Sequence, residues 1–254
     1  MVNAVLLLGQ SNMSGRGDPA DVEPIVDARI KVLRNGRWQK MFVPVHFERK
    51  GCGTCLAESF AKAYVDEHPN EEEILGLIPC ADGGSSISMW QPGELLYDHA
   101  VMQAKLAQRT SNIVAILWHQ GESDCPPGKY PLYEEKFLNT VRSLRRDLNL
   151  PEVPFIVGGI GAFIANFVSK TKGAVYGGYV HINAALQKVV AEEPNMAFVS
   201  AEGLNHRGDD LHFDAKSLRE FGLRYYDAFR KMENKTAACE QKSDTTEHTE
   251  LEEF

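Results

Sequence analysis

The sequence has no long apolar run, since nowhere in its 254 residues do 18 apolar side chains follow one another. A helix that crosses a bilayer needs about 20 such residues, so we expect no transmembrane helix and no membrane partner. Residues 1–8 are too short, and lack the basic start, for a secretory signal peptide. The sequence therefore predicts a cytoplasmic protein.

Positive charge is also scarce. The chain has 27 Lys and Arg residues against 35 Asp and Glu residues, which gives a formal net charge of −8. Proteins bind nucleic acid through clustered Lys and Arg side chains that neutralise phosphates. The densest basic patch, at residues 142–146, has helical spacing and is interpreted as a solvated helix face. The composition argues against nucleic acid as a partner.

Cysteines are few and odd in number, because the chain has five of them, and this does not make a disulfide framework. Cys52 and Cys55 have the CxxC spacing of redox and zinc sites. A structural zinc site needs a second pair of ligands, and no other CxxC or close Cys/His pair follows. We interpret the spacing as chance, keep thiol redox chemistry as an alternative, and expect no metal and no cofactor.

The chain also lacks a linker rich in Pro, Gly or Ser and an internal repeat of fixed period. A single α/β domain fits this length comfortably, because it would bury roughly 70 to 75% of the unfolded surface. Beyond Glu233 the sequence is polar and acidic, with too little apolar content to offset the entropy lost on ordering. We predict one domain over residues 1–232 and a mobile acidic tail over residues 233–254.

The chain does contain short apolar runs between longer amphipathic stretches, which is the pattern of repeated βα units. The runs predict five strands, at residues 2–8, 74–79, 113–118, 154–159 and 196–200. Helices are predicted at residues 54–68, 94–108, 131–148, 175–192 and 215–232. The segment 30–41, with Asn35 and Gly36 between two strand-like pieces, is typical of a β-hairpin outside the main sheet. These patterns together indicate a parallel sheet with helices on both faces.

Polar clusters follow four of the expected strands. Ser11 follows the first strand, residues 82–86 the second, residues 119–124 the third and residues 209–212 the fifth. In open parallel sheets, ligands bind beyond the carboxyl ends of the strands, where the strand order reverses. We therefore expect the four clusters to meet at one edge of the sheet and to build a single site.

These clusters contain the groups that nucleophilic catalysis by serine requires. A serine hydroxyl needs a base beside it, and the base needs a carboxylate that fixes its tautomer. Ser11 is the candidate nucleophile and His212 the candidate base. Asp209 is the candidate acid, since a turn of three residues can bring its carboxylate to the far ring nitrogen. Asp210 and Asp214 could compete for this role, but Asp214 is expected to cap the last helix.

Ester hydrolysis also needs donors for the oxygen that becomes negative. The candidates are the backbone amide of Ser11, the close-approaching backbone of the glycine pair at residues 83–84, and the side-chain amide of Gln120. Glu122 would oppose a developing negative charge, so we expect it to point away and support the loop. The alternative is that Glu122 replaces Asp209 as the acid.

Three further residues near these clusters are open to two interpretations. His119 is expected to be structural or to face the substrate, because strand geometry turns it opposite to the following residue. Trp90 and Trp118 could offer flat surfaces to a sugar ring, or they could simply belong to the core. Each residue alone has an ordinary structural explanation, and it is their conjunction at one sheet edge that points to a site.

Four motifs stand in a fixed order along the chain, namely Gly9-Gln10-Ser11-Asn12-Met13, Gly83-Gly84-Ser85 leading to Trp90, His119-Gln120-Gly121-Glu122-Ser123 and Asp209-Asp210-Leu211-His212. They resemble the ordered blocks of the SGNH hydrolase superfamily. More closely, they resemble its sialate O-acetylesterase and acetyl xylan esterase branch, family six of the carbohydrate esterases, over about residues 2–229. The resemblance implies a flavodoxin-like three-layer αβα sandwich with a five-stranded parallel sheet, and metal-free removal of O-acetyl groups from carbohydrate.

The same resemblance implies Ser11, His212 and Asp209 as a catalytic triad. It also implies that Gln120 donates to the oxyanion beside the amides of Ser11 and Gly84. Gly-Gln-Ser stands here where the superfamily commonly has Gly-Asp-Ser, a difference that the carbohydrate branch shares. We therefore predict a serine esterase that forms an acetyl-enzyme and acts on a small-molecule or oligosaccharide acetyl ester. The alternative is a noncatalytic carbohydrate-binding protein with the same fold.

Overall fold

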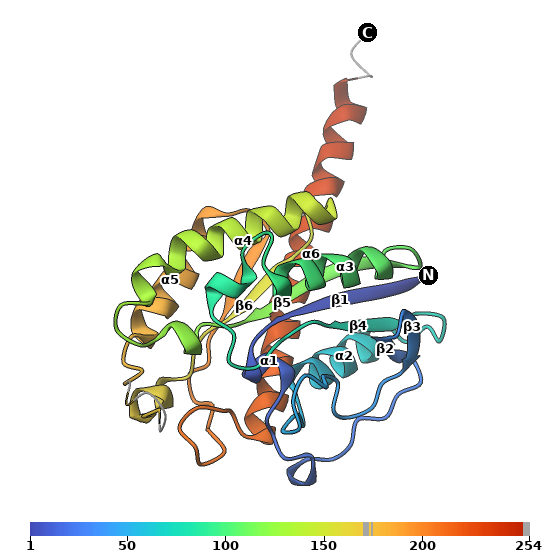
Figure 1. The fold of residues 1–254 in the computed structure, drawn as a ribbon. Helices are drawn as coiled ribbons and strands as arrows, with labels where there is room; N and C mark the ends of the chain where they lie inside the picture. The colour runs from blue at the N-terminus through green and yellow to red at the C-terminus, as the bar shows by residue number, and fades with distance from the viewer. Residues whose placement is uncertain (170–172, 174, 251–254) are drawn as a thin grey trace.

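A seven-stranded sheet forms the centre of the part of the chain that the computed structural model describes, residues 1–169, 173 and 175–250 (Figure 1). Its strands are β1 Val2–Gly9, β2 Ile30–Arg34, β3 Arg37–Lys40, β4 Leu75–Pro79, β5 Ser111–His119, β6 Phe155–Gly158 and β7 Met196–Val199. They lie in the order β3-β2-β4-β1-β5-β6-β7. Every neighbouring pair is parallel except β2 and β3, so the predicted parallel sheet is confirmed.

The five strands expected from the apolar runs are β1, β4, β5, β6 and β7. Numbered among themselves, they lie in the order second, first, third, fourth, fifth, which is the flavodoxin-like order. From β1 the chain first adds β4 on one side and then β5 on the other. The strand order therefore reverses between β1 and β5, and this geometry predicts a ligand site beyond their carboxyl ends.

The expectation for residues 30–41 was wrong in one respect. They do form an antiparallel hairpin, with Asn35 and Gly36 both at positive φ in the turn. However, β2 also pairs in parallel with β4, so the hairpin extends the main sheet instead of lying outside it. The physical reason is that Ile30 and Val32 are fully buried apolar side chains on alternate positions of β2. The sheet therefore has seven strands in the described residues and not five.

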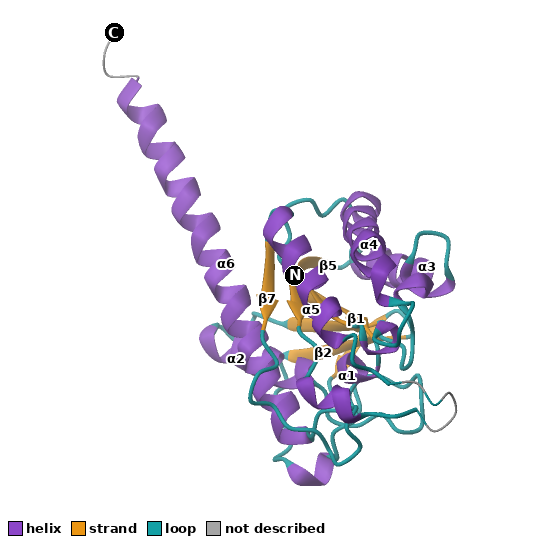
Figure 2. Cartoon of the chain, turned by 90° about the vertical axis from the view of Figure 1, so that its left-hand side faces the viewer, coloured by secondary structure: helices purple, strands orange, loops and turns teal. Residues whose placement is uncertain are grey.

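Helices cover both faces of the sheet, so the predicted three layers are confirmed (Figures 1 and 2). The α-helices are α1 Ser11–Ser14, α2 Leu56–Glu67, α3 Leu95–Ala107, α4 Tyr133–Leu148, α5 Tyr179–Glu192 and α6 Ala215–Glu250. Short 3₁₀ segments occur at Pro19–Asp21, Ile87–Trp90, Glu122–Asp124, Tyr130–Leu132 and Ala162–Asn166. Buried side chains of α3, α4 and α5 share one core, and those of α2 and α6 share the other.

The central strand β1 is apolar without interruption from Ala4 to Leu8, and the packing shows why. Ala4, Leu6 and Leu8 belong to the core that includes α3, α4 and α5, whereas Val5 and Leu7 belong to the core that includes α2 and α6. All five side chains are fully buried. Successive side chains of a strand point to opposite faces, so a strand covered on both sides has no position for a polar residue. Apart from Asn3 near the start of β1, which donates from Nδ2 to the Tyr64 hydroxyl at 2.8 Å, polar side chains come only after the strand ends.

The last helix begins as predicted and ends later. The Asp214 carboxylate accepts a hydrogen bond from the Ser217 amide at 2.7 Å, which is the expected N-terminal cap. The helix continues past residue 232 to Glu250, and its final turns project from the body of the molecule (Figure 1). The domain boundary and the mobile tail over residues 233–254 stay predictions, and residues 251–254 lie outside the described residues.

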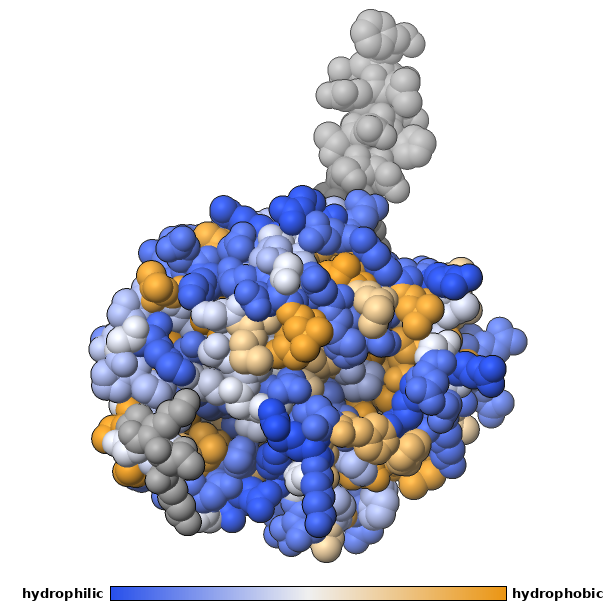
Figure 3. Space-filling model, in the orientation of Figure 1, coloured by the Kyte–Doolittle hydropathy of each residue, from blue (hydrophilic) through white to orange (hydrophobic). Residues whose placement is uncertain are grey.

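Polar side chains cover most of the face seen in Figure 3, with apolar residues in small groups between them. Scattered apolar residues of this kind are normal on the surface of a folded protein. Among the helices of the described residues, none has the length and the apolar character that crossing a bilayer requires.

Candidate active site

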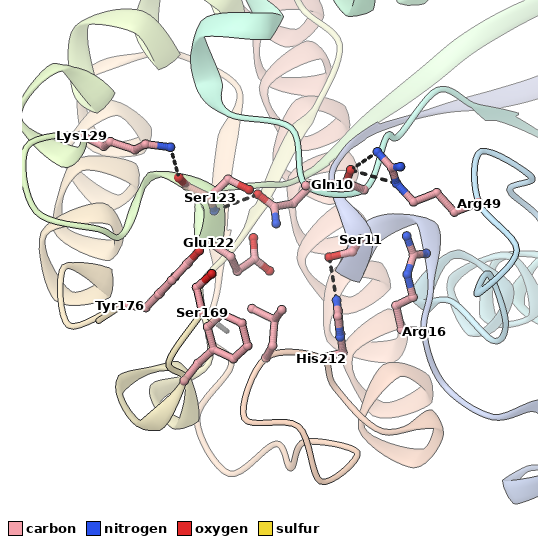
Figure 4. Close-up of a pocket in the computed structure, with 14 residues that line it drawn as sticks. Gln10, Ser11, Arg16, Arg49, Glu122, Ser123, Lys129, Ser169, Tyr176 and His212 are labelled. Carbon is pink, nitrogen blue, oxygen red and sulfur yellow. Dashed lines mark hydrogen bonds between the residues drawn. The ribbon is translucent and has the colours of Figure 1, made fainter. Parts of the chain in front are cut away.

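A cavity of about 510 Å³ opens beyond the carboxyl ends of β1 and β5, where the strand order reverses (Figure 4). Its wall includes Gln10, Ser11, Gly84, Glu122, Tyr176 and His212. These residues come from loops that follow β1, β4, β5, β6 and β7. The four polar clusters, which we expected to meet at one edge of the sheet, therefore do lie together in the structure.

Ser11 reaches this cavity because of a close approach between the ends of two strands. Gly9 closes β1 with φ at +134° and pairs with His119 at the end of β5. A Cβ atom on Gly9 would lie 2.0 Å from the carbonyl oxygen of His119, so only glycine fits there. The chain then turns directly into α1, whose first residue is Ser11.

The three predicted triad residues lie in a hydrogen-bonded chain. The Ser11 hydroxyl oxygen is 3.1 Å from Nε2 of His212, and Nδ1 of His212 is 2.8 Å from Oδ2 of Asp209. The other carboxylate oxygen of Asp209 accepts the amides of Leu211 at 3.0 Å and His212 at 2.8 Å. One short loop thus holds both the imidazole and the carboxylate, and it places the ring against a serine 201 positions earlier in the chain.

The electrostatics of this loop favour an ionised Asp209. Partial burial alone would raise the pKa of Asp209, but the hydrogen bonds from the His212 amide and ring and from the Leu211 amide lower it below its usual value. Of the competing carboxylates, Asp210 has an oxygen 3.4 Å from Nε2 of His206, and Asp214 caps α6. Neither of them therefore takes the place of Asp209 beside His212.

Glu122 lies in the cavity wall but does not contact His212. One carboxylate oxygen accepts hydrogen bonds from Nδ2 of Asn12 at 2.5 Å and from Nε2 of His119 at 3.1 Å. Burial alone would raise the pKa of Glu122, but the neighbouring His119, together with the hydrogen bonds from His119 and Asn12, lowers it. His119 itself is fully buried and packs edge-on against the ring of Phe213. His119 therefore lies in the interior and does not face the cavity.

Asn12 is a residue of the site that the sequence reasoning assigned no role. Its Nδ2 donates to the Leu211 carbonyl at 3.2 Å, and its Oδ1 accepts the Phe213 amide at 3.1 Å. These are the two residues on either side of His212. Asn12 therefore ties the loop that carries the imidazole to the turn that carries Ser11. The only sequence signal was its place in the motif, directly after Ser11.

The three expected oxyanion donors are placed differently from one another. Ser11 and Gly84 line the cavity, and neither of their backbone amides has a hydrogen-bond partner among the described residues. Gly84 adopts φ of +78°, and a side chain there would meet open space. Gln120 is instead fully buried and is not part of the cavity wall. Two of the three expected donors therefore lie at the cavity, and the third, Gln120, is buried behind the cavity wall.

Two arginines support the cavity rim, and sequence reasoning missed both. Arg49 donates from Nε and Nη2 to the Gly83 carbonyl, at 3.1 and 2.6 Å, and so fixes the turn that presents the Gly84 amide (Figure 4). Arg16 pairs with Glu48 at 2.7 Å, with both side chains largely buried. Single arginines in long loops carry no periodic signal, so only the folded chain reveals these contacts.

The aromatic residues expected to offer a sugar surface lie elsewhere. Trp90 and Trp118 are fully buried and pack against each other with ring centroids 5.3 Å apart. They belong to the core, which was the second of the two interpretations. Phe167 and Tyr176 line the cavity instead, and their rings form an edge-to-face pair with centroids 4.8 Å apart.

Cys52 and Cys55 do not form a reactive pair. Cys55 is buried at the start of α2, and burial raises its pKa well above the usual value. Burial and the hydrogen bond to Glu48 also raise the pKa of Cys52. Reactive thiols need a lowered pKa, so these environments do not favour redox chemistry. Over the described ranges, no group of three or more His, Cys, Asp and Glu side chains is arranged to hold a metal ion.

Comparison with known proteins gives a consistent result. The profile of a family described as carbohydrate esterase, sialic acid-specific acetylesterase, matches residues 1–231. A probable carbohydrate esterase of Arabidopsis thaliana is 28% identical in an alignment of length 245, and the match covers 88% of this chain and 88% of that protein. The X-ray structure of an Arabidopsis thaliana protein superposes with a TM-score of 0.79 at 27% identity, covering 91% of this chain and 98% of that one.

More distant solved structures share the fold. That of NanS has a TM-score of 0.71 at 18% identity and covers 92% of this chain and 98% of that chain. That of a carbohydrate acetylesterase from Xanthomonas citri has a TM-score of 0.66 at 18% identity, with 91% of this chain and 56% of that chain covered.

Proposed function

The chain belongs to the carbohydrate esterase family of sialic acid-specific acetylesterases, and on that basis we propose that it removes O-acetyl groups from carbohydrates through an acetyl-enzyme on Ser11. Membership of this family makes it a carboxylic ester hydrolase that acts on carbohydrate esters. The observation that carries the serine mechanism is the chain of contacts from Ser11 to His212 at 3.1 Å and from His212 to Asp209 at 2.8 Å. Both contacts lie within the distance that proton transfer requires.

In the first half of the reaction, Ser11 attacks the acetyl group. Nε2 of His212 takes the hydroxyl proton while Oγ of Ser11 forms a bond to the carbonyl carbon. The carbonyl oxygen becomes negative and faces the free amides of Ser11 and Gly84. When the intermediate collapses, the bond from the carbonyl carbon to the sugar oxygen breaks. His212 then gives its proton to that oxygen, and the sugar leaves as an alcohol.

In the second half, water repeats the sequence. His212 takes a proton from a water molecule as its oxygen bonds to the acetyl carbon, and the collapse of this intermediate breaks the bond to Oγ. The proton returns to Ser11, and acetate is released. Asp209 stays ionised throughout, holds the proton on Nδ1 of His212, and stabilises the imidazolium that forms twice in each turnover.

The cavity fits a small acetylated sugar or the end of an oligosaccharide. Its volume of about 510 Å³ lies within the usual range of small-molecule sites. Phe167 and Tyr176 supply apolar ring surface, and the sugar ring has apolar faces that can pack on it. Two of the cations that line the cavity are matched by acids, since Arg16 pairs with Glu48 and Arg49 lies 3.1 Å from Asp82.

The test is acetate release by wild type and by Ser11→Ala, with acetylated xylooligosaccharides, acetylated sialic acids and p-nitrophenyl acetate as substrates. We expect the variant to lose hydrolysis of every substrate and to keep the melting temperature of the wild type. The matched control is Ser123→Ala, because Ser123 also lines the cavity but its hydroxyl is not hydrogen-bonded to a histidine in the described residues. Its rate should fall by less than about tenfold.

Trapping gives a second readout. Rapid quenching with a good leaving group should show one added acetyl group on the peptide that contains Ser11, and none in Ser11→Ala. Turnover by Ser11→Ala at the wild-type rate would reject the mechanism. Tight binding of an acetylated sugar to the wild type, with the ester intact after prolonged incubation, would favour the noncatalytic binding protein instead.

A further inference from the structure

A second cavity lies beside the one that contains Ser11, and the proposed mechanism uses none of its residues. Its volume is about 440 Å³, which is within the usual range of small-molecule sites. Four segments line it, namely residues 33–35 of the β2–β3 hairpin, residues 45–48, residues 79–82 and the side of α3 that carries Leu96, His99 and Gln103. We call it the α3 cavity.

The two cavities share a wall. Asp82 lines the α3 cavity, whereas Gly83 and Gly84, the next two residues, line the cavity with Ser11. Consecutive Cα atoms are about 3.8 Å apart, so this wall is a short turn of chain. Arg49 crosses it at the edge of the cavity with Ser11, where its Nη2 lies 3.1 Å from the Asp82 carboxylate (Figure 4). The Arg49 side chain is 56% exposed, so a ligand bound in one cavity can pass over it to the other.

The charged groups of the α3 cavity are already engaged. Its two acids, Glu48 and Asp82, pair with arginines that line the other cavity. Nη2 of Arg34 donates to two backbone carbonyls of the following loop, at 2.8 and 3.1 Å. Burial lowers the pKa of His46 to about 4, so this ring is uncharged at neutral pH. These contacts favour an uncharged ligand.

Three polar side chains of the α3 cavity have no hydrogen-bond partner in the described residues. Asn35 lies in the hairpin turn, and His99 and Gln103 lie one helical turn apart on α3. Two amides and an imidazole offer both donors and acceptors. Sugar hydroxyls also donate and accept, so a sugar unit matches the chemistry of all three groups.

An aromatic ring lies at the edge of the α3 cavity. Phe47 lines the cavity and is 55% exposed. The guanidinium carbon of Arg34 lies 3.3 Å from its ring centroid, and the Phe42 ring packs beside it with centroids 5.9 Å apart. These contacts hold the Phe47 ring in place although about half of it faces solvent. A sugar ring has apolar faces that can pack on such a surface.

We propose that the α3 cavity binds a neutral sugar unit linked to the acetylated unit at Ser11. The inference rests on the proposed function and specifies its substrate as a linked glycan. The acetylated unit lies in the cavity with Ser11, and the glycan passes over Arg49. The neighbouring neutral unit packs on Phe47 and hydrogen-bonds to His99 and Gln103. Binding of this second unit raises kcat/KM for the linked substrate above that for the free sugar.

Two pairs of substrates test the proposal. One pair is an O-acetylated xylotetraose and the matching O-acetylated methyl xyloside, and the other is O-acetylated sialyllactose and free O-acetylated sialic acid. In each pair the added units are neutral. We expect kcat/KM of the wild type to be at least about tenfold higher for the linked member, since several contacts add. Phe47→Ala and Gln103→Ala should each lower this value by about 3- to 10-fold, mainly through KM, because each removes one contact with the second unit.

The same variants should hydrolyse the free sugars and p-nitrophenyl acetate at the wild-type rate, since neither Phe47 nor Gln103 lines the cavity with Ser11. The matched control is Phe42→Ala. Phe42 is 48% exposed and also packs on Arg34, at 4.3 Å, but it does not line the α3 cavity. This control should keep the wild-type kcat/KM for both members of each pair. All three variants should melt near the temperature of the wild type.

Binding to an inactive enzyme gives a readout that needs no turnover. In the Ser11→Ala background, isothermal titration calorimetry measures the dissociation constants of the linked substrate and of the free sugar. Adding Phe47→Ala should raise the first by about 3- to 10-fold and leave the second unchanged. An unchanged dissociation constant for the linked substrate would refute binding in the α3 cavity.

Two kinetic results would also overturn the inference. One is equal kcat/KM for the linked and free members of both pairs in the wild type. The other is a loss in Phe42→Ala as large as that in Phe47→Ala, which would mean that the two rings act only through Arg34. Both leave the proposed function intact as long as Ser11→Ala is inactive. An active Ser11→Ala would instead reject the serine mechanism without changing the preference for linked substrates.

Discussion

Asp209→Asn tests whether Asp209 sets the tautomer of the His212 imidazole. In the wild type, Oδ2 of Asp209 lies 2.8 Å from Nδ1 of His212, so the ring carries its proton on Nδ1 and presents a bare Nε2 to Ser11. In the variant, Oδ1 can still accept the amides of Leu211 and His212, so the loop keeps its shape. The new NH₂ group then faces Nδ1, which must give up its proton. The proton moves to Nε2, and the ring can no longer accept the proton of Ser11.

The magnitude follows from this change of tautomer. An equivalent Asp to Asn change in a serine protease lowers kcat by about 10⁴-fold, which corresponds to about 5.5 kcal/mol in the barrier. The Asp209 side chain is 36% exposed, so water can partly compensate, and we expect a loss of about 10³- to 10⁴-fold. Stability should change little, because both amide contacts survive.

The assay is kcat for p-nitrophenyl acetate at neutral pH, together with the melting temperature. The matched control is Asp210→Asn, the same substitution one residue further on, where the carboxylate lies near His206. It should keep at least about half of the wild-type rate. An Asp209→Asn variant within tenfold of the wild type, or an equal loss in Asp210→Asn, would contradict the role of Asp209 as the orienting acid.

Two further predictions concern residues around the site. Asn12→Leu should lower kcat by about 10²-fold and the free energy of unfolding by about 1–3 kcal/mol, because the buried Phe213 amide loses its acceptor. A kcat within twofold of the wild type would mean that the loop with His212 keeps its position without the hydrogen bonds from Asn12. His46 is 3% exposed, and burial lowers its pKa to about 4, so stability should fall as the pH drops from about 6.5 towards 4. Urea unfolding should show a loss of about 2 kcal/mol between pH 7 and pH 5 that His46→Leu removes, and an unchanged loss in that variant would refute the assignment.

The sheet was predictable from the sequence wherever a strand is covered on both faces. In β1, every side chain from Ala4 to Leu8 is apolar because each meets one of two cores, and such runs give an unambiguous signal. The hairpin at residues 30–41 was recognised, but its place was not. β2 has only five residues, of which Lys31 and Arg34 are partly exposed, and so short a segment does not indicate which strand edge it will pair with.

The site was predictable at the level of its motifs. Ser11, His212 and Asp209 could be nominated because each follows a strand or stands at a spacing with a chemical meaning, and the structure brings them together. Their catalytic roles stay predictions until they are measured. The orientations of Gln10 and Gln120 could not be read, because both are amides in loops and their hydrogen-bond partners come from distant segments. Sequence spacing does not record which way such a side chain turns.

The division of the site between the two ends of the chain has a consequence for biosynthesis. Ser11 is synthesised about 200 residues before the loop that carries Asp209 and His212, which follows β7. That loop is complete in its packing only after α6 has also been made, because Phe213 shares a core with the buried side chains of α6. On the proposed mechanism, a nascent chain can therefore assemble most of its sheet before it is able to hydrolyse an ester. If the proposed mechanism holds, hydrolysis begins only when the loop with Asp209 and His212 has packed against the turn with Ser11.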